Sequence, residues 1–427
     1  MSMGSQSAGR GSGPGEGKVM EKNSGGWGNY LLPIVAACLL YALSGGIRAV
    51  YGIMIRPLTV LSGISYADAA FAFGIAQLLY GLTQPLWGAL ALRRGSRPVL
   101  LAGAVLMAAG LFLTPLARST GELTLYLGII LASGTGALCF GLIMGTLSPL
   151  LGPQRASAVS GILNAASGIG SAFLSPALQG MNAAWGIGTS LRVLGGALAC
   201  MVLVILWLCS LKQAGKPSSQ AAEEASQEAI GSVLRRAWGT WAYKALLIGF
   251  STCGFHMVII QTHLVPQMES LGVPGSTAAM LYTGFGLTTL LGSILSGFFC
   301  LRFPQPRVLG TLYGLRVVTV VLFMFLLPQN TLCLGLFTLL LGFTGDATVT
   351  PTSEIISRRF GPASMGFLFG LTFVCHQIGG FVSSWLGGIL FTQTGSYQTI
   401  WLADAVLCAI ASLASYSISR RVPALEK

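Results

Sequence analysis

The fold of this chain is decided by Gly88-Ala-Leu-Ala-Leu-Arg-Arg-Gly-Ser-Arg97, a short basic segment between two apolar runs. A weaker copy, Gly297-Phe-Phe-Cys-Leu-Arg302, follows 209 residues later. The same shift, without gaps, relates five further pairs of glycines: Gly45 and Gly254, Gly136 and Gly345, Gly152 and Gly361, Gly161 and Gly370, and Gly170 and Gly379. A chain that matches itself over both halves in this way contains an internal duplication.

The composition places the chain in a membrane. Of its 427 residues, 53% are hydrophobic and only 8% are charged, whereas a soluble domain carries about 25% charged residues. Only helices and closed barrels span a bilayer, because every backbone polar group must find its partner within the protein. The apolar runs are about 20 residues long, the length of a spanning helix, whereas a barrel strand needs about ten alternating residues. The sequence therefore predicts an all-α membrane protein.

Twelve transmembrane helices are expected, at residues 30–54, 67–91, 97–116, 122–147, 155–178, 188–211, 241–266, 275–300, 307–327, 331–350, 363–390 and 397–419. The domains that follow are a disordered cytoplasmic tail (1–29), a six-helix bundle (30–211), a cytoplasmic linker (212–240), a second six-helix bundle (241–420) and a C-terminal tail (421–427). Because each half has six spans, both have the same orientation, and an axis along the membrane normal relates the two pseudo-symmetric bundles.

The distribution of basic residues indicates the orientation. Among the 24 Lys and Arg residues, 19 fall in the termini and in the loops on the same side as the termini. Arg56, Arg118 and Arg192 are expected at the other side, and Arg48 and Arg316 within helices. Because cytoplasmic loops are enriched in Lys and Arg, this bias predicts a multi-pass protein of a cell membrane, a bacterial inner membrane in particular, with both termini cytoplasmic. It also accounts for the net charge of +12 without a nucleic-acid partner.

No cofactor or metal is expected. The nine cysteines are scattered singly, without a C-x-x-C pair, and are typical of small packing residues. The sequence has no G-x-x-x-x-G-K-[ST] segment, the pattern that binds ATP phosphates. Energy for any active process would therefore come from an ion gradient. Two duplicated hydrophobic halves are how many secondary transporters are built.

The basic segment resembles a family signature. Gly88, Arg93, Gly95 and Arg97 match the motif that members of the major facilitator superfamily carry between their second and third helices, except that Leu92 stands where the family has Asp or Glu. The resemblance covers almost the whole chain. It implies the major facilitator fold, a monomeric transporter that works by alternating access, and a conformational gate formed by these four residues. Without the acid, the arginines bond helix-end carbonyls or pair elsewhere.

A narrower resemblance concerns bacterial relatives of the monocarboxylate and oxalate–formate transporters. It rests on Gly25-Gly-Trp-Gly28, Gly45-Gly-Ile-Arg-Ala-Val-Tyr-Gly52, Gly254-Phe-His256 with Thr262-His263-Leu264, and His376-Gln377-Ile-Gly-Gly380. Those families commonly place a substrate-binding arginine in the eighth helix, where this chain has no charged residue. The resemblance implies a small organic anion, a monocarboxylate in particular, as the substrate.

Arg48 is the main candidate for binding such an anion. A charge at membrane depth costs about 2.5–3.5 kcal/mol on insertion scales, so each one needs a physical reason. Arg48 lies on a glycine-rich face of the first helix, and its planar guanidinium matches a carboxylate. The alternative is that Arg48 extends to the outer surface beside Arg56.

All three histidines fall within expected helices. By the repeat, His256 corresponds to the neighbour of Arg48, so we expect it to face Arg48 and to bind substrate or a proton; simple packing is the alternative. No carboxylate or cysteine stands at metal-ligand spacing from it. His263, near the outer end, is expected to meet water. His376 and Gln377 offer donors to substrate, or a hydrogen bond that only holds helices together.

A carboxyl in the tenth helix, Asp346, is the candidate for carrying the coupling proton, with a structural hydrogen bond as the alternative. Gln77 and Tyr80 on the second helix and Asn164 on the fifth are expected as polar contacts to substrate. Three further ionisable residues are expected to be structural: Asp68 in a capping box with Ser65, Arg316 and Asp404.

The function expected from the sequence is secondary active transport of a small organic anion, coupled to protons, through a site near the bilayer midplane. One alternative keeps the fold and exports drugs or siderophores. Another is a multipass membrane acyltransferase, and the duplication argues against it because such an enzyme needs no symmetric halves.

Overall fold

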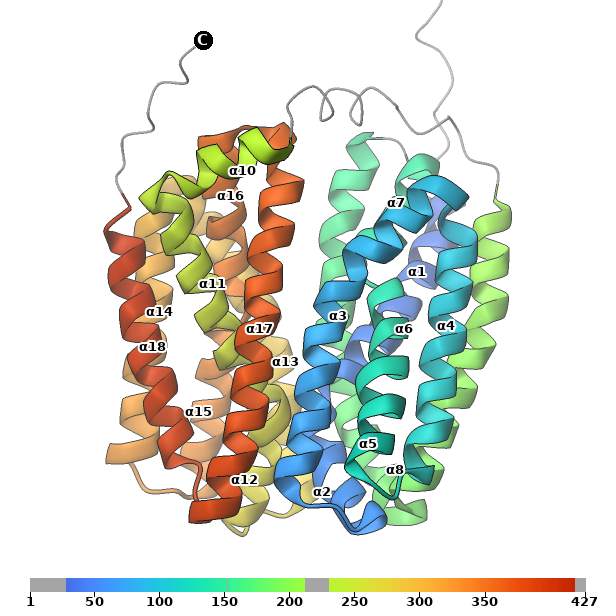
Figure 1. Cartoon of the computed structure of the whole chain (residues 1–427), viewed down its shortest axis with the longest axis vertical. Coiled ribbons are helices and arrows are strands. Elements are labelled where there is room, and N and C mark those ends of the chain that lie inside the picture. The colour runs from blue at the N-terminus through green and yellow to red at the C-terminus, as the bar shows by residue number, and fades with distance from the viewer. Residues whose placement is uncertain (1–27, 152, 212–229, 419–427) are drawn as a thin grey trace, which may run out of the picture.

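The computed structural model describes residues 28–151, 153–211 and 230–418. Within these ranges the chain is almost entirely helical, and its long helices run side by side in two groups (Figure 1). The expected tail 1–29, except for its last two residues, the tail 421–427 and the linker segment 212–229 lie outside the described residues. The helices α1 to α8 are called the N-terminal half, and α10 to α18 the C-terminal half.

The N-terminal half crosses the bundle six times. The first crossing is α1 (Gly28–Ala49) followed by α2 (Tyr51–Ser62). The second is α3 (Tyr66–Arg94), and the third is α4 (Ser96–Leu113) with the 3-10 turn η1 (Thr114–Leu116). The fourth consists of α5 (Thr120–Leu123), the π-helix η2 (Thr124–Leu131), α6 (Ala132–Ala137) and α7 (Phe140–Leu151). The fifth and sixth are the two arms of α8 (Pro153–Ser210), which bends at Gly186.

The C-terminal half begins with the short helix α10 (Ile230–Trp238) and then also crosses six times. The seventh crossing is α11 (Trp241–Ile259), the π-helix η3 (Ile260–Leu264) and α12 (Val265–Ser270). The eighth and ninth are α13 (Gly275–Arg302) and α14 (Gln305–Val321) with η4 (Leu322–Leu326). The tenth is α15 (Thr331–Thr344), η5 (Asp346–Thr348) and α16 (Val349–Phe360), and the last two are α17 (Pro362–Thr394) and α18 (Gln398–Tyr416).

Length and apolar composition alone identify ten membrane-spanning segments among the described residues. One of these, Gly161–Ser210, holds two crossings, because Gly186 has φ 75° and ψ 161° and turns the chain back. Another crossing, α3, is 29 residues long but is not among the ten. Counting both gives the twelve crossings that the sequence predicts.

The expected span boundaries differ from the observed ones where the chain is kinked or polar. The first span, expected at 30–54, is interrupted at Val50, which has φ −98° and ψ 21°. The tenth, expected at 331–350, is interrupted near Gly345 and then continues to Phe360. Its last turns are amphipathic and carry Arg358 and Arg359, so an apolar run does not reveal where the helix ends.

The backbone repeats with the same period as the sequence. Gly63 and Gly272, 209 residues apart, both have positive φ, 74° and 85°, at the ends of equivalent spans. Packing repeats too. A Cβ built on Gly170 of α8 would overlap the carbonyl of Ala42 of α1, and one on Gly379 of α17 would overlap the carbonyl of Ser251 of α11. Ala42 and Ser251 are themselves 209 residues apart, so the duplication extends to individual helix contacts.

The halves meet chiefly along two helix pairs, α3 with α17 and α8 with α13, and also where α2 contacts η3 and α12. We call the end of the molecule where α1 begins and α18 ends the near end, and the opposite end the far end (Figure 1). Along α3, a Cβ on Gly74 would lie 3.1 Å from Phe381 of α17, whereas one on Gly88, closer to the near end, would meet nothing within 4 Å. The contact between these helices is therefore tight toward the far end and open toward the near end.

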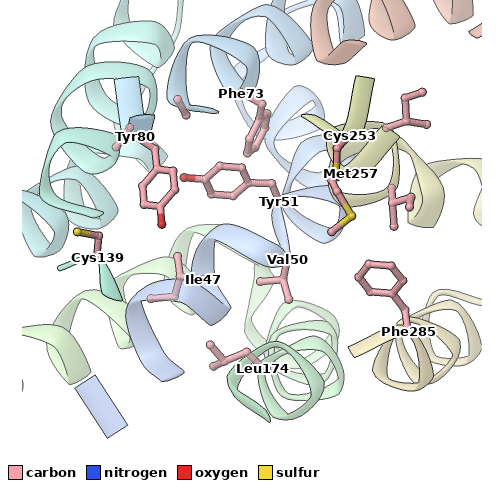
Figure 2. Close-up of a cluster of buried hydrophobic side chains, with 14 of the residues drawn as sticks. Ile47, Val50, Tyr51, Phe73, Tyr80, Cys139, Leu174, Cys253, Met257 and Phe285 are labelled. Carbon is pink, nitrogen blue, oxygen red and sulfur yellow. The ribbon is translucent and has the colours of Figure 1, made fainter. Parts of the chain in front are cut away.

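One apolar core joins the halves. Figure 2 shows Tyr51 and Phe73 of the N-terminal half in the same cluster as Met257 and Phe285 of the C-terminal half. Helix ends are fixed locally: Ser65 caps α3, where its Oγ accepts the N–H of Asp68 at 3.1 Å and donates to that carboxylate at 2.7 Å. This confirms that Ser65 and Asp68 cap the helix as expected, although the Asp68 carboxylate accepts from the Ser65 hydroxyl, whereas in a capping box it accepts from the backbone N–H.

Candidate functional site

Arg48 lies in the last turn of α1, directly before the break at Val50. A guanidinium is favourable there because helix carbonyls are left without intrahelical donors at a C-terminus. Its Nη1 donates to the side-chain oxygens of Gln77 and Gln261, both at 3.1 Å. Its Nε is buried and has no hydrogen-bond partner among the described residues. Arg48 thus points into the protein between the halves, not outward beside Arg56.

Three glutamines connect the halves around Arg48. Gln77 of α3 donates through Nε2 to Gln261 of η3 at 2.9 Å, and Gln377 of α17 donates to the backbone carbonyl of Gln77 at 2.8 Å. All three are almost fully buried. Gln77 and Gln377 are two of the residues expected from the sequence. Gln261 was not expected; its only signal is its place in the seventh helix, between His256 and His263.

Tyr80 lies one turn from Gln77 on α3 and contributes its ring. The guanidinium carbon of Arg48 is 4.6 Å from the ring centroid, which is cation–π geometry. Tyr80 is buried. The aromatic face therefore adds to the stabilisation of the charge that the glutamine oxygens provide.

Asp346 begins η5, midway along the tenth crossing. It is nevertheless exposed, and it lies within electrostatic range of Arg48 and His376. Asp346 and Arg48 both lie within electrostatic range of Tyr80 and Tyr282. The carboxyl thus lies within electrostatic range of Arg48 and belongs to the opposite half.

His376 of α17 is half-buried and stacks on Phe373, with ring centroids 5.4 Å apart and planes at 7°. Its Nδ1 is 2.9 Å from Oε1 of the adjacent Gln377. Because Gln377 also bonds α3, His376 is tied to the contact between the halves. Asn164, in contrast, is exposed on α8, and no hydrogen bond in the described part of the chain links it to this group.

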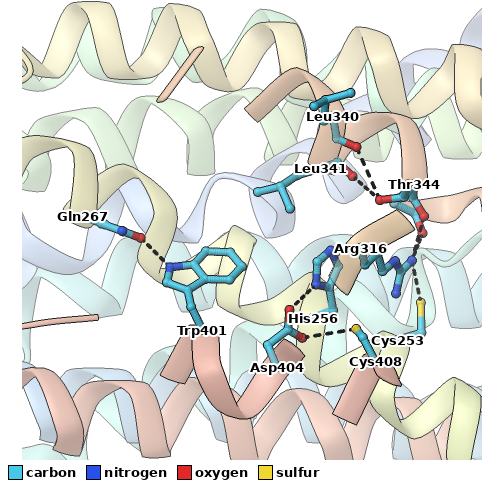
Figure 3. Close-up of polar contacts among 11 residues, drawn as sticks. Cys253, His256, Gln267, Arg316, Leu340, Leu341, Thr344, Trp401, Asp404 and Cys408 are labelled. Carbon is cyan, nitrogen blue, oxygen red and sulfur yellow. Dashed lines mark hydrogen bonds and ion pairs between the residues drawn. The ribbon is translucent and has the colours of Figure 1, made fainter. Parts of the chain in front are cut away.

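His256 does not face Arg48, contrary to the expectation from the repeat. It is fully buried, and its Nδ1 lies 2.7 Å from the carboxylate of Asp404 on α18 (Figure 3). Ile47, its counterpart in the repeat, is a buried core residue. The reason is that a repeat equates backbone positions, whereas the partner of a side chain depends on which neighbouring helix offers a complementary group.

The sequence shows no carboxylate or cysteine at metal-ligand spacing from His256. In the fold, however, α18 brings one of each, Asp404 and Cys408, close to it. His256, Asp404 and Cys408 have ligand atoms within 4.8 Å of one another and are all buried. Arg316 lies within electrostatic range of the same imidazole. A permanent positive charge beside the cluster opposes binding of a cation, so these residues fit a charge-balanced group better than a metal site.

The far end is closed by a second polar cluster, which also corrects the expectation that His263 meets water. His263 is fully buried between the halves. Its Nδ1 is 2.8 Å from the hydroxyl of Tyr66 on α3, and its Nε2 is 2.9 Å from the carbonyl of Ser384 on α17. Tyr397 extends the chain with a 2.9 Å bond to Tyr66. His263, which was expected to meet water, is thus part of the contact that closes the far end.

The gate motif lies at the near end. Gly95 joins α3 to α4 with φ 82°, a conformation that favours glycine. Arg93 and Arg97 are exposed. Arg97 and Gly95 border a cavity of about 160 Å³ between this turn, α7 and α8. In this conformation the motif contacts its own half.

The arrangement has a definite chemical capacity. A guanidinium from the N-terminal half and a carboxyl from the C-terminal half lie within electrostatic range of each other. A guanidinium can bind an anionic group, and an ionised carboxyl in its range competes with that anion for the positive charge.

Comparisons with known proteins agree with this reading of the fold. The chain is 28% identical over 411 residues to monocarboxylate transporter 11 of Mus musculus, covering 93% of this chain and 89% of that protein. It is 26% identical over 403 residues to monocarboxylate transporter 13 of Rattus norvegicus, covering 91% and 88%. An uncharacterized MFS-type transporter, YcxA of Bacillus subtilis, is 28% identical over 196 residues, covering 43% and 44%.

Solved structures share the fold. A bacterial homolog of the human lysosomal transporter Spinster, in an inward-facing and occupied conformation, matches with a TM-score of 0.72 at 15% identity, covering 92% of this chain and 97% of that one. A D-xylose-proton symporter matches with a TM-score of 0.71 at 16% identity, covering 90% and 97%. The sequence model of the Major Facilitator Superfamily matches residues 37–267 and 254–427. With twelve crossings, two repeated halves and a model match over nearly its whole length, this chain belongs to the Major Facilitator Superfamily of transporters.

Proposed function

We propose that this multipass transporter moves a small monocarboxylate together with a proton. One observation carries the proposal: the Nη1 atom of Arg48 is held by two glutamine oxygens, one from each half, while its Nε is buried without a protein partner. A buried donor without an acceptor is costly. A carboxylate that accepts from the Nε edge would satisfy it in the bidentate geometry that arginine favours.

Asp346 is the proposed carrier of the coupling proton. When Asp346 is ionised, it competes with an anion for the charge of Arg48; when it is protonated, the anion and Arg48 balance. Because Arg48 does not balance an ionised Asp346 and a bound anion together, each monoanion is transported with one proton. His376, which lies within electrostatic range of Asp346, and Gln77, Tyr80 and Gln377 complete the proposed substrate contacts.

Alternating access is the proposed mechanism, with the protein acting as a monomer in the cell membrane. The near end, where the basic residues gather, is proposed to be cytoplasmic. The state described here is then closed to the outside by the cluster around His263. In the opposite state the near ends would close, which would bring the gate motif residues Gly88, Arg93, Gly95 and Arg97 against the other half.

The monocarboxylate class is supported by the full-length similarity to monocarboxylate transporters and by the single guanidinium at the site. An exporter of drugs or siderophores remains the second candidate, because the same fold serves both uses. The two differ in one requirement: an anion carrier depends on Arg48, and an exporter of apolar compounds does not. Membership of a transporter family leaves no support for the acyltransferase.

The test is substrate-induced proton uptake into proteoliposomes, with lactate, pyruvate, formate, oxalate and aromatic acids. We expect a signal with at least one monocarboxylate, lost in Arg48→Ala and kept in Arg118→Ala. Arg118 is the matched control because it is exposed at the far end and its guanidinium donates to the nearby carbonyls of Pro115 and Ala117. Normal reconstitution with no response to any acid would refute the proposal and place the exporter first.

A further inference from the structure

A fully buried group of charges lies within the C-terminal half, apart from the residues assigned to substrate. It consists of His256 of α11, Arg316 of α14 and Asp404 of α18 (Figure 3), each with no exposed surface. Burying charged groups costs free energy unless they are balanced and hydrogen-bonded. Their contacts indicate what this group does.

Arg316 holds the end of α15. Its Nη2 donates to the backbone carbonyls of Thr344 and Gly345, both at 2.7 Å. The helix ends here because Gly345, with φ −51° and ψ −88°, leaves helical geometry, so these carbonyls lack intrahelical donors. The next residue is Asp346. Arg316 therefore fixes the backbone from which the proposed coupling carboxyl projects.

His256 lies between a positively charged residue, Arg316, and a negatively charged one, Asp404 (Figure 3). An ionised Asp404 accepts at 2.7 Å from Nδ1, so the ring hydrogen is on Nδ1 and the Nε2 of a neutral ring is an acceptor. This Nε2 has no partner among the described residues, and neither do Nε and Nη1 of Arg316. The group has unused donors and an unused acceptor, which is unusual for fully buried atoms.

The charge balance depends on the protonation of His256. Among the described residues, the charged or titratable groups that face it are Asp404 and Cys408 of α18 and Arg316 of α14, and Cys253 and Tyr313 in turn face Arg316. With neutral His256, Arg316 and Asp404 balance. A proton on His256 adds a second positive charge near Arg316, and repulsion between charges is strong in a low-dielectric interior. Movement of Arg316 away from the α15 carbonyls would relieve this repulsion between His256 and Arg316.

We propose that Arg316 is the positioning residue of Asp346 and that protonation of His256, held by Asp404, releases this positioning. The inference rests on the proposed role of Asp346 in proton coupling. By linkage, any conformation that frees Arg316 binds the His256 proton more tightly, so the transport cycle and the proton on His256 affect each other reciprocally. Arg316 and Asp404, expected to be architectural, thereby become part of the coupling.

The first experiment reads the proton on His256 directly, in purified full-length protein without substrate. The ring of Trp401 lies 6.3 Å from that of His256, and a protonated imidazole quenches the fluorescence of a neighbouring indole. The Trp401 emission is obtained as the difference between wild type and Trp401→Phe, titrated between about pH 8 and pH 5. We expect quenching in acid, abolished in His256→Asn, whose amide keeps a donor toward Asp404 but does not become charged.

The second experiment tests whether Arg316 positions Asp346, by measuring the rate of transport as a function of pH. Arg316→Lys, which keeps the charge, is expected to retain the pH response, and Arg316→Gln, which keeps a donor only, to lose it. His256→Asn should change the ratio of uptake at acid and neutral pH by about fivefold or more, the usual size of coupling between sites. Trp401→Phe is the matched control, because it removes a 2.7 Å bond to Gln267 in the same region but no charge.

Two results would overturn the proposal. One is a Trp401 emission that does not depend on pH in folded wild-type protein, a measurement that needs no variant of His256 to fold. The other is a pH response of transport that persists in Asp346→Asn and is lost when His256→Asn is added. His256 would then act independently of Asp346. Failure of every acid to drive proton uptake would refute the proposed function alone and leave the fluorescence result intact.

Discussion

Tyr66 of α3 and His263 of η3 share a hydrogen bond of 2.8 Å that joins the two halves at the far end. The second ring nitrogen of His263 lies 2.9 Å from the carbonyl of Ser384 and donates to it, so Nδ1 accepts from the tyrosine hydroxyl. Arg56 and Glu269 lie alongside, 3.8 Å apart, and also connect the halves. A histidine with both ring nitrogens hydrogen-bonded is thus one of several polar contacts that close the far end.

Removing the tyrosine hydroxyl should weaken this closure. In Tyr66→Phe the Nδ1 atom of His263 remains buried without its donor, at a cost of about 1–3 kcal/mol. We expect a lower melting temperature in detergent and faster labelling of a cysteine introduced at Ala70, which is fully buried against α17. Tyr126→Phe is the control, since its hydroxyl makes no hydrogen bond within the described residues. Equal behaviour of the two variants would show that the contact does not hold the far end closed.

Replacing Arg48 by lysine should separate charge from geometry. Lysine keeps the positive charge but cannot offer two parallel donors to a carboxylate. A lost hydrogen bond to a charged group is worth about 1.5–3 kcal/mol, so we expect substrate affinity to fall about 10- to 150-fold, measured by isothermal titration calorimetry. An affinity unchanged in Arg48→Lys would mean that the substrate senses only the charge.

Neutralising Asp346 should uncouple transport from the proton gradient. The amide in Asp346→Asn imitates the protonated carboxyl, so exchange of substrate for substrate should continue. Uptake driven by a pH gradient should fall by about tenfold or more, within the usual range of coupling between sites. Counterflow and gradient-driven uptake in the same proteoliposomes measure both. Loss of counterflow together with uptake would instead assign Asp346 to substrate binding or to the fold.

Two glycines of α17 should respond differently to alanine. At Gly379 a Cβ would overlap the carbonyl of Ser251 on α11, whereas at Gly370 it would meet nothing within 4 Å. Overpacking costs about 1–3 kcal/mol, so Gly379→Ala should lower the melting temperature while Gly370→Ala does not. Equal melting temperatures in the two variants would show that the contact at Gly379 relaxes to accept a methyl group.

The sequence alone determined the architecture. Apolar runs of bilayer length, the 209-residue repeat and the basic segment at Gly88–Arg97 predicted twelve spans in two related halves, because a bilayer admits few backbone solutions. Single polar residues within apolar helices also identified Arg48, Gln77 and Gln377, since a charge or amide at membrane depth needs a partner. These conclusions require only the local composition of the chain and the constraint of a bilayer, and the composition itself shows that the chain lies in a bilayer.

Only the tertiary structure decided which polar residues share a site. By sequence, His256 belonged with Arg48; in the fold it turns to Asp404, and Gln261, five residues later, takes the place beside Arg48. The helix between them changes to a π-helix at Ile260, which alters the face that each following residue presents. A period of 3.6 residues cannot anticipate such a change. Neither can it show which helix lies opposite, because that choice is made by packing across the whole bundle.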